Sequence, residues 1–255
     1  MKHYYINLSR RPERNQNMID LFAKLEITDY ERIEAVDGNL VDYSKVLSNG
    51  MQVCKNWLDP LEDRPLTTGE VGCILSHIVA WSKIAKSGKP GIILEDDLFH
   101  SSDKYNIRQI EERLDDFDLV YLSKWNMDME MVGFDDLFEI PGYCYWTAGY
   151  ALSVKGAQLL LNNVGLNNLI PADEYLPMML GTSPLLDKYP QFKELPKLKG
   201  LAYKNNIFSP YKRETEIGRT DTETATTFKE WKNFKLLTVA TESLKAENLI
   251  KSCKV

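Results

Sequence analysis

The chain has 255 residues, of which 44% are hydrophobic, and it carries a formal net charge of −6 at pH 7. This length is sufficient for one sizeable core, so we expect one α/β domain with a C-terminal extension. The acidic balance disfavours binding of a phosphate backbone, which argues against a nucleic-acid partner. It does not exclude a nucleotide, because carboxylates can recruit a metal ion that reverses the local field.

Segments with strand and helix patterns alternate along the chain. The predicted strands cover residues 3–8, 31–36, 91–95, 118–123 and 145–154, and the predicted helices cover residues 11–26, 68–86, 106–116, 155–164, 172–180 and 228–255. Thr67 and Glu70 match a capping box at the start of the second helix, and Gly88 ends it. Residues 39–66 are expected to form a long connection. This order predicts a mostly parallel sheet with helices on both faces, in which ligands bind beyond the carboxyl ends of the strands.

The segment GIILEDDLFH places three carboxylates directly after a strand that is predicted to be buried. Adjacent negative charges repel one another unless a cation compensates them, and Mg²⁺ and Mn²⁺ prefer oxygen ligands. Because side chains alternate along an extended chain, Glu95 and Asp97 are expected to point to one side and Asp96 to the other. The pattern fits a metal clamp for diphosphate oxygens, and it fits a solvated acidic turn equally well.

Charged residues also follow the first two predicted strands. Arg10, Arg11 and Arg14 could contact a diphosphate, although a solvated helix start is the simpler explanation for any one of them. Asp37 could hold a ribose hydroxyl or belong to a plain turn.

His77 shares one face of its predicted helix with Glu70 and Trp81. A lone histidine is more often structural than catalytic, and this shared face changes that balance only modestly. The segment YCYWTAGY is rich in aromatic residues that either form a core or provide a platform for a sugar ring: Tyr143, Tyr145, Trp146 and Tyr150.

Two further segments carry paired carboxylates. In IPADEYLP, Asp173 and Glu174 fall in the first turn of a helix that begins after Pro171. The helix dipole favours carboxylates there, which is also a purely structural explanation, and it is expected to keep them ionised as a general base requires. In RTDTETATT, Asp221 and Glu223 lie in a polar loop that is either a turn or a segment closing over a metal-bound nucleotide.

Two features bear on the compartment. The start MKHYYINLSRRPERN has one short apolar run before a basic patch, and no run of about 18 apolar residues exists, so we expect neither a signal peptide nor a membrane span. The cysteines are not paired at metal-ligand spacing, so we expect neither a zinc site nor a disulfide framework: Cys54, Cys73, Cys144 and Cys253.

Eight segments occur in one order that is informative as a set. They are YYINLSRRPERNQNM, EAVDG, DRPLTTGEVGCILSHIVAW, ILEDDL, DFDLVYL, YWTAGYALSVKGAQLLL, IPADEYLPMM and RTDTETATT. Together they resemble glycosyltransferase family 25 over about residues 3–228. The closest likeness is to the C-terminal transferase domain of the procollagen hydroxylysine galactosyltransferases. The bacterial lipooligosaccharide galactosyltransferases share fewer of these segments.

This resemblance implies a GT-A fold with a Rossmann-like sheet over residues 1–227, and the Lys- and Glu-rich residues 228–255 are expected to form a helical extension. It implies inverting transfer of a hexose from a UDP-hexose donor with Mn²⁺ as cofactor. For such a reaction we expect Asp173 or Glu174 to act as the base. The implied metal contacts are Glu95, Asp96, Asp97, Asp221 and Glu223. The implied donor contacts are Asn7, Leu8, Arg11, Arg14 and Asp37. From their positions in the sequence we also expect His77 and Trp146 to contact the donor.

The implied acceptor is hydroxylysine or galactosyl-hydroxylysine in a collagen-like protein, with galactose and glucose equally open as the transferred sugar. One alternative is transfer to a lipid-linked or lipopolysaccharide-type glycan. Another is a catalytically inactive module that binds a UDP-sugar or collagen. Unlike the collagen enzymes, this sequence shows no second transferase domain, secretory signal or retention tail, so we expect a cytoplasmic protein of viral or bacterial origin.

Overall fold

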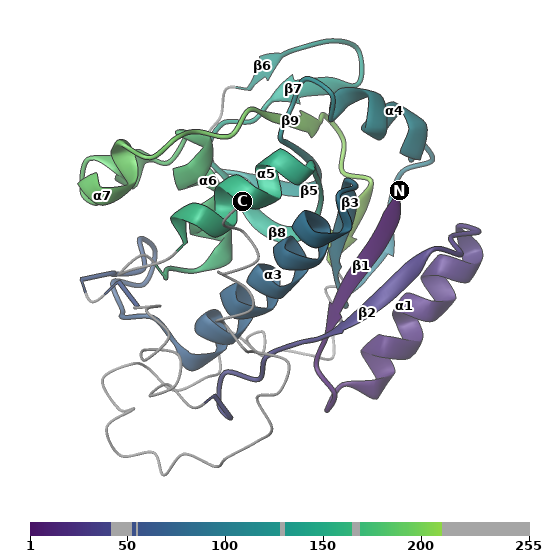
Figure 1. The fold of residues 1–255 in the computed structure, drawn as a ribbon, viewed down its shortest axis with the longest axis horizontal. Helices are drawn as coiled ribbons and strands as arrows, with labels where there is room; N and C mark the ends of the chain where they lie inside the picture. The colour runs from purple at the N-terminus through teal and green to yellow at the C-terminus, as the bar shows by residue number, and fades with distance from the viewer. Residues whose placement is uncertain (42–52, 55, 128–130, 165–168, 211–255) are drawn as a thin grey trace.

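The computed structural model describes residues 1–41, 53–54, 56–127, 131–164 and 169–210. Within these residues, an eight-stranded sheet lies between helices on both of its faces (Figure 1). The predicted extension over residues 228–255, the boundary at residue 227, and Asp221 and Glu223 lie outside the described residues. No helix in the described part is long and apolar enough to cross a membrane.

The strands of the large sheet follow the order β2-β1-β3-β8-β5-β9-β7-β6. Their bounds are β1 (Lys2–Asn7), β2 (Tyr30–Glu34), β3 (Gly91–Glu95), β5 (Leu119–Asn126), β6 (Val132–Gly133), β7 (Phe138–Ile140), β8 (Cys144–Leu152) and β9 (Gly200–Tyr203). A separate antiparallel pair joins β4 (Leu98–His100) to β10 (Phe208–Pro210). The sequence did not predict β4, β6, β7, β9 or β10.

The prediction of a mostly parallel sheet is wrong. Strand β1 runs parallel to β2 and β3, and β5 runs parallel to β9, but β8 is antiparallel to both β3 and β5. The edge pairs β7–β9 and β6–β7 are antiparallel as well. Only the short strands β6 and β7 separate β5 from β8 in the chain, and a parallel neighbour would need a long crossover, usually a helix.

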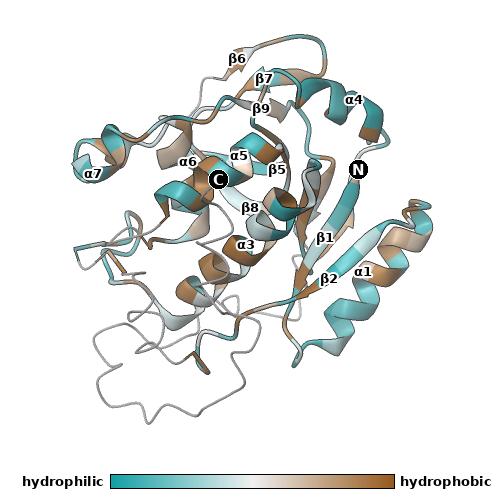
Figure 2. Ribbon diagram, in the orientation of Figure 1, coloured by the Kyte–Doolittle hydropathy of each residue, from teal (hydrophilic) through white to brown (hydrophobic). Residues whose placement is uncertain are grey.

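The predicted helices that fall within the described residues are present, with ends that differ by at most a few residues. They are α1 (Pro12–Lys24), α3 (Thr68–Ser87), α4 (Ile107–Arg113), α5 (Val154–Asn163) and α6 (Ala172–Leu180), to which the structure adds η1 (Pro184–Leu186) and α7 (Pro190–Lys193). Helix α3 is buried along most of its length and is more hydrophobic than α1, whose outer side is largely hydrophilic (Figure 2).

Alternation of side chains along the strands produces a hydrophobic core on each face of the sheet. In β1, Tyr4 and Ile6 pack into one core while Tyr5 packs into the other. Helices α3, α5 and α6 complete the first core, and α1 and α4 complete the second. The expectation of helices on both faces is therefore confirmed.

Helix α3 begins and ends as the sequence predicts. The Thr67 side chain accepts a hydrogen bond from the Glu70 backbone N–H, and the Glu70 carboxylate accepts one from the Thr67 N–H, which completes the capping box. Gly88 ends the helix in a left-handed conformation with φ 65°. The capping box fixes the first turn of α3, where Gly69 and Glu70 line the cavity described below.

The loop after β2 lies directly against the first turns of α3. A Cβ atom at Gly38 would lie 1.7 Å from the carbonyl oxygen of Thr68, and one at Gly72 would lie 2.5 Å from that of Val36. Glycine at both positions therefore permits the approach that holds Asp37 at the edge of the sheet.

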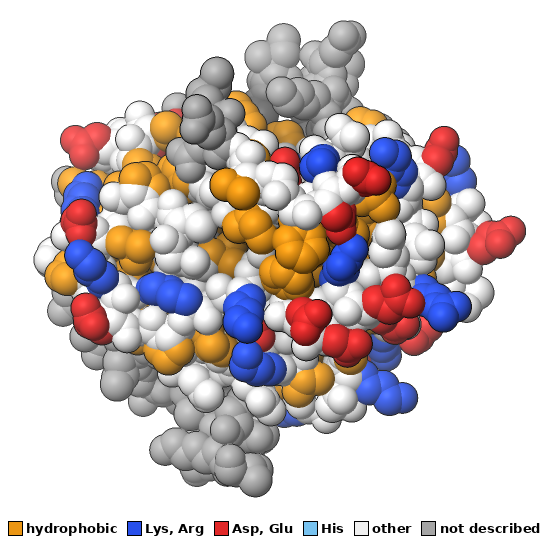
Figure 3. All heavy atoms as spheres, turned by 90° about the horizontal axis from the view of Figure 1, so that it is seen from above, with side chains coloured by type: hydrophobic (Ala, Val, Ile, Leu, Met, Phe, Trp, Pro, Cys, Tyr) orange, Lys and Arg blue, Asp and Glu red, His pale blue; other side chains and the backbone are white. Residues whose placement is uncertain are grey.

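The face over β6, β7 and α4 carries exposed hydrophobic side chains (Figure 3). Val132 in β6 and the nearby Phe134 are among the exposed hydrophobic residues. Acidic and basic side chains are interspersed around them in this view. This face therefore has no continuous basic surface of the kind that binds a phosphate backbone.

Candidate active site

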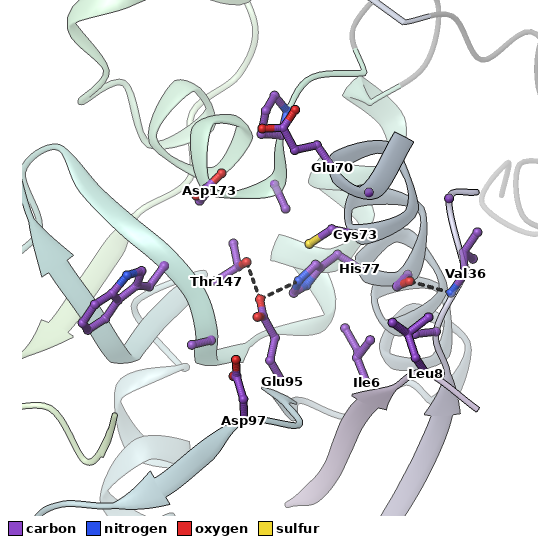
Figure 4. A pocket seen from close by; sticks show the side chains of 18 of the residues that line it. Ile6, Leu8, Val36, Glu70, Cys73, His77, Glu95, Asp97, Thr147 and Asp173 are labelled. Atoms are coloured by element: carbon purple, nitrogen blue, oxygen red, sulfur yellow. Dashed lines mark hydrogen bonds and ion pairs between the residues drawn. The ribbon is translucent and has the colours of Figure 1, made fainter. Parts of the chain in front are cut away.

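A cavity of about 410 Å³ lies beyond the carboxyl ends of β1, β2 and β3 (Figure 4). Leu8 lines it after β1, Asp37 after β2, and Glu95 at the end of β3. The first half of α3, the amino-terminal half of β8 and the start of α6 complete the lining. The antiparallel direction of β8 brings its first residues, rather than its last, to this edge of the sheet.

Glu95 and Asp97 lie on the cavity side of the acidic segment (Figure 4). One oxygen of Glu95, Oε1, accepts a hydrogen bond from Thr147 Oγ1 at 2.7 Å and lies 3.3 Å from His77 Nε2. Two neighbouring side chains thus fix the orientation of the first carboxylate.

Asp96 is held by two other side chains. Its carboxylate accepts hydrogen bonds from Asn7 Nδ2 at 2.7 Å and from Arg14 Nη1 at 3.2 Å. The same Arg14 nitrogen lies 3.6 Å from Asp97 Oδ2. Asn7 was predicted to contact the donor, but it is buried, does not line the cavity, and supports Asp96 and Arg32 instead.

The two cavity carboxylates differ in their electrostatics. Burial, and then the charge of Glu95, raise the pKa of Asp97 to about 7 against the opposing effect of Arg14. Burial alone would also raise the pKa of Glu95, but the hydrogen bonds from His77 and Thr147 outweigh it and bring that pKa below its usual value. The site therefore places close together two half-buried carboxylates, of which Asp97 carries a charge that its neighbours do not compensate.

His77 is fully buried within a chain of hydrogen bonds. Trp81 Nε1 donates to the Tyr150 hydroxyl at 2.8 Å, and this hydroxyl lies 2.9 Å from His77 Nδ1. The other ring nitrogen faces Glu95. His77 was predicted to contact the nucleotide-sugar donor, and it lines the cavity. Its hydrogen bonds show that it also positions Glu95.

At the β1–β2 end, the cavity is lined by Leu8 and Asp37, two residues that the resemblance implies as contacts of the nucleotide-sugar donor. Arg10 lines it as well and donates from Nε to Asp37 Oδ2 at 2.8 Å. Arg11 does not line the cavity, and its Nη1 lies 3.5 Å from Glu13 Oε1. Of these two arginines, Arg10 lines the cavity and Arg11 does not.

Asp173 points into the cavity from the first turn of α6 (Figure 4). Burial raises its pKa to about 8, and Glu174, Glu70 and Glu95 add to the effect. The expectation that the helix dipole keeps Asp173 readily ionised is wrong, because burial and neighbouring negative charges outweigh the dipole.

Glu174 has a different environment from its neighbour. It is 2% exposed, and its Oε1 accepts hydrogen bonds from Tyr143 Oη at 2.8 Å and from Tyr145 Oη at 2.5 Å. Tyr143 and Tyr145 therefore hold the start of α6. Of the two predicted bases, Glu174 is hydrogen-bonded to these tyrosines, whereas the Asp173 carboxylate has no hydrogen bond to another described side chain.

Trp146 lines the cavity in an unusual backbone conformation, with φ 75°. Positive φ is rare for a bulky residue and marks strain of the kind that accumulates at functional sites. Its ring lies 5.6 Å from that of Trp125, which also lines the cavity and is 53% exposed. Tyr150 is fully buried and belongs to the core. Sequence reasoning missed Trp125 because it ended this strand at residue 123, whereas β5 continues to Asn126.

Arg64 is a second residue that sequence reasoning missed. It lies in the predicted connection, lines the cavity, and donates to both carboxylate oxygens of Glu70 at 3.0 and 2.9 Å. Glu62 and Asp59 lie within ion-pair distance of the same guanidinium. This cluster ties the connection to the first turn of α3.

Residues 1–176 match the sequence model of glycosyltransferase family 25, described as LPS biosynthesis proteins. The chain belongs to glycosyltransferase family 25.

Several relatives share this membership. A glycosyltransferase 25 family member of Aedes aegypti is 37% identical over 191 residues, which are 71% of this chain and 31% of that protein. Procollagen galactosyltransferase 2 of Mus musculus is 31% identical over 235 residues, 88% of this chain and 37% of that protein. A probable inactive glycosyltransferase 25 family member 3 of Bos taurus is 34% identical over 191 residues, 71% of this chain and 32% of that protein. The chain thus spans about a third of the length of these relatives.

Among solved structures, the crystal structure of A197 from STIV is similar with a TM-score of 0.37 and 12% identity, over 83% of this chain and 85% of that chain. A similarity of this size carries no information about function.

The carboxylates of this family 25 chain fit a hard divalent cation. All three carboxylates line the cavity and offer oxygen ligands, and the raised pKa of Asp97 shows negative charge that its neighbours do not compensate. Asp96 is engaged by Asn7 and Arg14. Among the three, the pair Glu95 and Asp97 therefore suits a cation best.

Proposed function

We propose that this chain is an inverting, metal-dependent hexosyltransferase of the GT-A type. In this proposal it moves galactose or glucose from a UDP-sugar to hydroxylysine or galactosyl-hydroxylysine of a collagen-like protein. The observation that carries the proposal is that a cation-type carboxylate pair, Glu95 and Asp97, and a candidate base, Asp173, line one cavity. The procollagen galactosyltransferases among the relatives support the choice of sugar and acceptor.

The donor lies at the β1–β2 end of the cavity. Leu8 and the ion pair of Arg10 with Asp37 contact the uridine, with Asp37 available to a ribose hydroxyl. When bound by Glu95 and Asp97, Mn²⁺ supplies positive charge for the diphosphate leaving group. Arg14 already lies against the acidic segment and contributes a second positive charge at the same place.

Asp173 accepts the proton of the acceptor hydroxyl as that hydroxyl attacks the sugar. Inversion requires one base and a single displacement, and no covalent intermediate forms on the protein. The raised pKa of Asp173, about 8, gives its carboxylate a higher proton affinity than an ordinary aspartate has, which suits a general base near neutral pH. Glu174, held by its two tyrosines, positions this turn of α6 and takes no part in proton transfer.

The acceptor approaches beside the tryptophan pair. Trp125 and Trp146 present aromatic surface at the cavity, and a sugar ring or the aliphatic part of a lysine side chain would pack against such surface. This arrangement is compatible with both acceptor forms.

Two other functions have specific support. The family description names LPS biosynthesis, which favours a glycan acceptor. One relative is named as probably inactive, which favours a module that binds a UDP-sugar without transfer. The first predicts UDP release only with a glycan acceptor, and the second predicts UDP-sugar binding without release.

A screen of UDP release tests these functions against one another. It pairs UDP-galactose and UDP-glucose with hydroxylysine and galactosyl-hydroxylysine peptides, in Mn²⁺ and in chelator. We expect acceptor-dependent release in Mn²⁺ with one of these pairs, and its loss in Asp97→Asn but not in Asp103→Asn, an exposed aspartate outside the cavity. Failure of every pair to release UDP would refute the collagen-type function.

A further inference from the structure

A second group of side chains with metal-ligand chemistry lies on the α3 side of the cavity (Figure 4). Cys73 and His77 are four residues apart, so they share one face of α3, and Glu95 approaches them from the end of β3. Each residue offers one ligand atom, and the three atoms lie within 4.8 Å of one another: the Cys73 sulfur, a His77 ring nitrogen and a Glu95 oxygen. Thiol, imidazole and carboxylate together are a different donor set from the oxygen pair of Glu95 and Asp97.

The spacing of these atoms suits a small tetrahedral ion. Zinc bonds of about 2.0–2.3 Å place neighbouring ligand atoms roughly 3.3–3.8 Å apart. The 3.3 Å between His77 Nε2 and Glu95 Oε1 already meets this requirement. The Cys73 sulfur reaches it after a shift of about 1.3 Å at most, which is within the range of a change in its side-chain torsion.

Surrounding hydrogen bonds hold two of the three ligands in place. His77 Nδ1 contacts the Tyr150 hydroxyl at 2.9 Å, which leaves Nε2 directed at the cavity. Thr147 Oγ1 donates to Glu95 at 2.7 Å. Metal-binding histidines and carboxylates are generally fixed by such partners, so the network provides the support that a metal site requires.

We propose that Cys73, His77 and Glu95 form a binding site for Zn²⁺ or a similar thiophilic divalent cation. Thiolate and imidazole ligands select such ions over Mg²⁺ and Mn²⁺. Binding breaks the S–H bond of Cys73 and forms a metal–sulfur bond, and that proton passes to water. The Nε2–H proton of His77 also passes to water as the metal–nitrogen bond forms, and Nδ1 takes up a proton from water, so that the neutral ring donates to the Tyr150 hydroxyl. Three protein ligands leave a fourth position open toward the cavity. Sequence spacing predicts no zinc site because the third ligand comes from a separate strand.

This site has a consequence for transfer, which rests on the proposed function. Glu95 belongs both to the thiophilic site and to the oxygen pair that would hold Mn²⁺. One carboxylate cannot satisfy both ions fully, so Zn²⁺ should inhibit transfer in competition with Mn²⁺.

Co²⁺ provides a direct spectroscopic test that does not depend on transfer. We expect the full chain to bind one Co²⁺ with a thiolate-to-metal charge-transfer band in the near ultraviolet, and Zn²⁺ to displace it. Cys73→Ser should abolish the band, whereas Cys54→Ser, which removes a buried thiol outside the cavity, should keep it. Tyr150→Phe removes the hydroxyl that contacts His77 and should weaken Zn²⁺ binding by roughly 10-fold or more.

A measurement on the unaltered protein covers the case in which Cys73→Ser fails to fold. Saturating Zn²⁺ should slow alkylation of Cys73 by iodoacetamide, read by peptide mass spectrometry, and leave Cys54 unchanged. Absence of the charge-transfer band, its persistence in folded Cys73→Ser, or unchanged alkylation of Cys73 would each overturn the site. If the band appears but no acceptor releases UDP, the zinc site stands and the proposed transferase function fails.

Discussion

Replacement of Asp173 by asparagine should stabilise the protein while it abolishes transfer. Asparagine keeps the shape of the side chain and removes the charge that burial and neighbouring carboxylates disfavour. It also removes the proposed base, so we expect transfer to fall by roughly 10²–10⁴-fold while the affinity for UDP is retained.

The size and pH dependence of the stability change follow from the pKa of Asp173. It is 3.8 for an ordinary aspartate and about 8 in the fold. Because the folded pKa is the higher one, the stabilisation from this group is complete below the unfolded pKa and is lost as the pH rises through the folded pKa. Between these two pKa values, each unit of pH lowers the free energy of unfolding by about 1.4 kcal/mol. The total loss of stability between the unfolded pKa and pH 7 is at most about 4 kcal/mol. Because the side chain lines an open cavity, solvent screening reduces this loss of stability to on the order of 2 kcal/mol.

Thermal unfolding in chelator measures the effect. The melting temperature of Asp173→Asn should equal that of the unaltered protein near pH 4 and exceed it at pH 8 by roughly 4–8 °C. Asp103→Asn should show no such change with pH. A difference that is the same at both pH values, or an unaltered protein that is the more stable at pH 8, would refute the electrostatic argument.

Three other substitutions test separate parts of the site. Asp97→Asn should weaken Mn²⁺-dependent UDP binding by roughly 10–100-fold, measured by calorimetry, and unchanged Mn²⁺ dependence would reject the clamp. Trp125→Ala should raise the KM for the acceptor about fivefold with little change in the KM for the donor, and an equal rise in both would place Trp125 outside the acceptor site. Gly72→Ala should destabilise the fold by about 1–3 kcal/mol in denaturant titration despite the better helix propensity of alanine, because its Cβ would lie 2.5 Å from the Val36 carbonyl oxygen. Gly133→Ala, where nothing lies within 4 Å, is the control, and an equal effect of the two would contradict the packing argument.

Local patterns in the sequence predicted most of the regular elements. The capping box at Thr67 and the glycine at position 88 predicted the ends of α3, because both signals act within one helical turn. The direction of β8 was not accessible in the same way. It depends on which strands become neighbours in space, and the short edge strands β6, β7 and β9 carry too few residues to show a period.

The candidate site was predicted at the level of segments more reliably than at the level of side chains. The acidic segment after β3 and the start of α6 do line one cavity. Arg10 and Arg11 could not be told apart, because the turn after β1 decides which guanidinium faces the cavity. The pKa of Asp173 had the wrong expected direction, because its burial arises from elements that are distant in the chain. Trp125 reaches the cavity only because β5 continues beyond its predicted end.

Analysis of the product tests the central claim most directly. The protein would be incubated with Mn²⁺, each UDP-hexose, and hydroxylysine or galactosyl-hydroxylysine peptides, and the product examined by mass spectrometry and NMR. The account predicts the addition of one hexose with inverted, β configuration at the anomeric carbon, on one of these acceptors. Binding of UDP without addition of hexose to any acceptor, or a product with retained configuration, would contradict it.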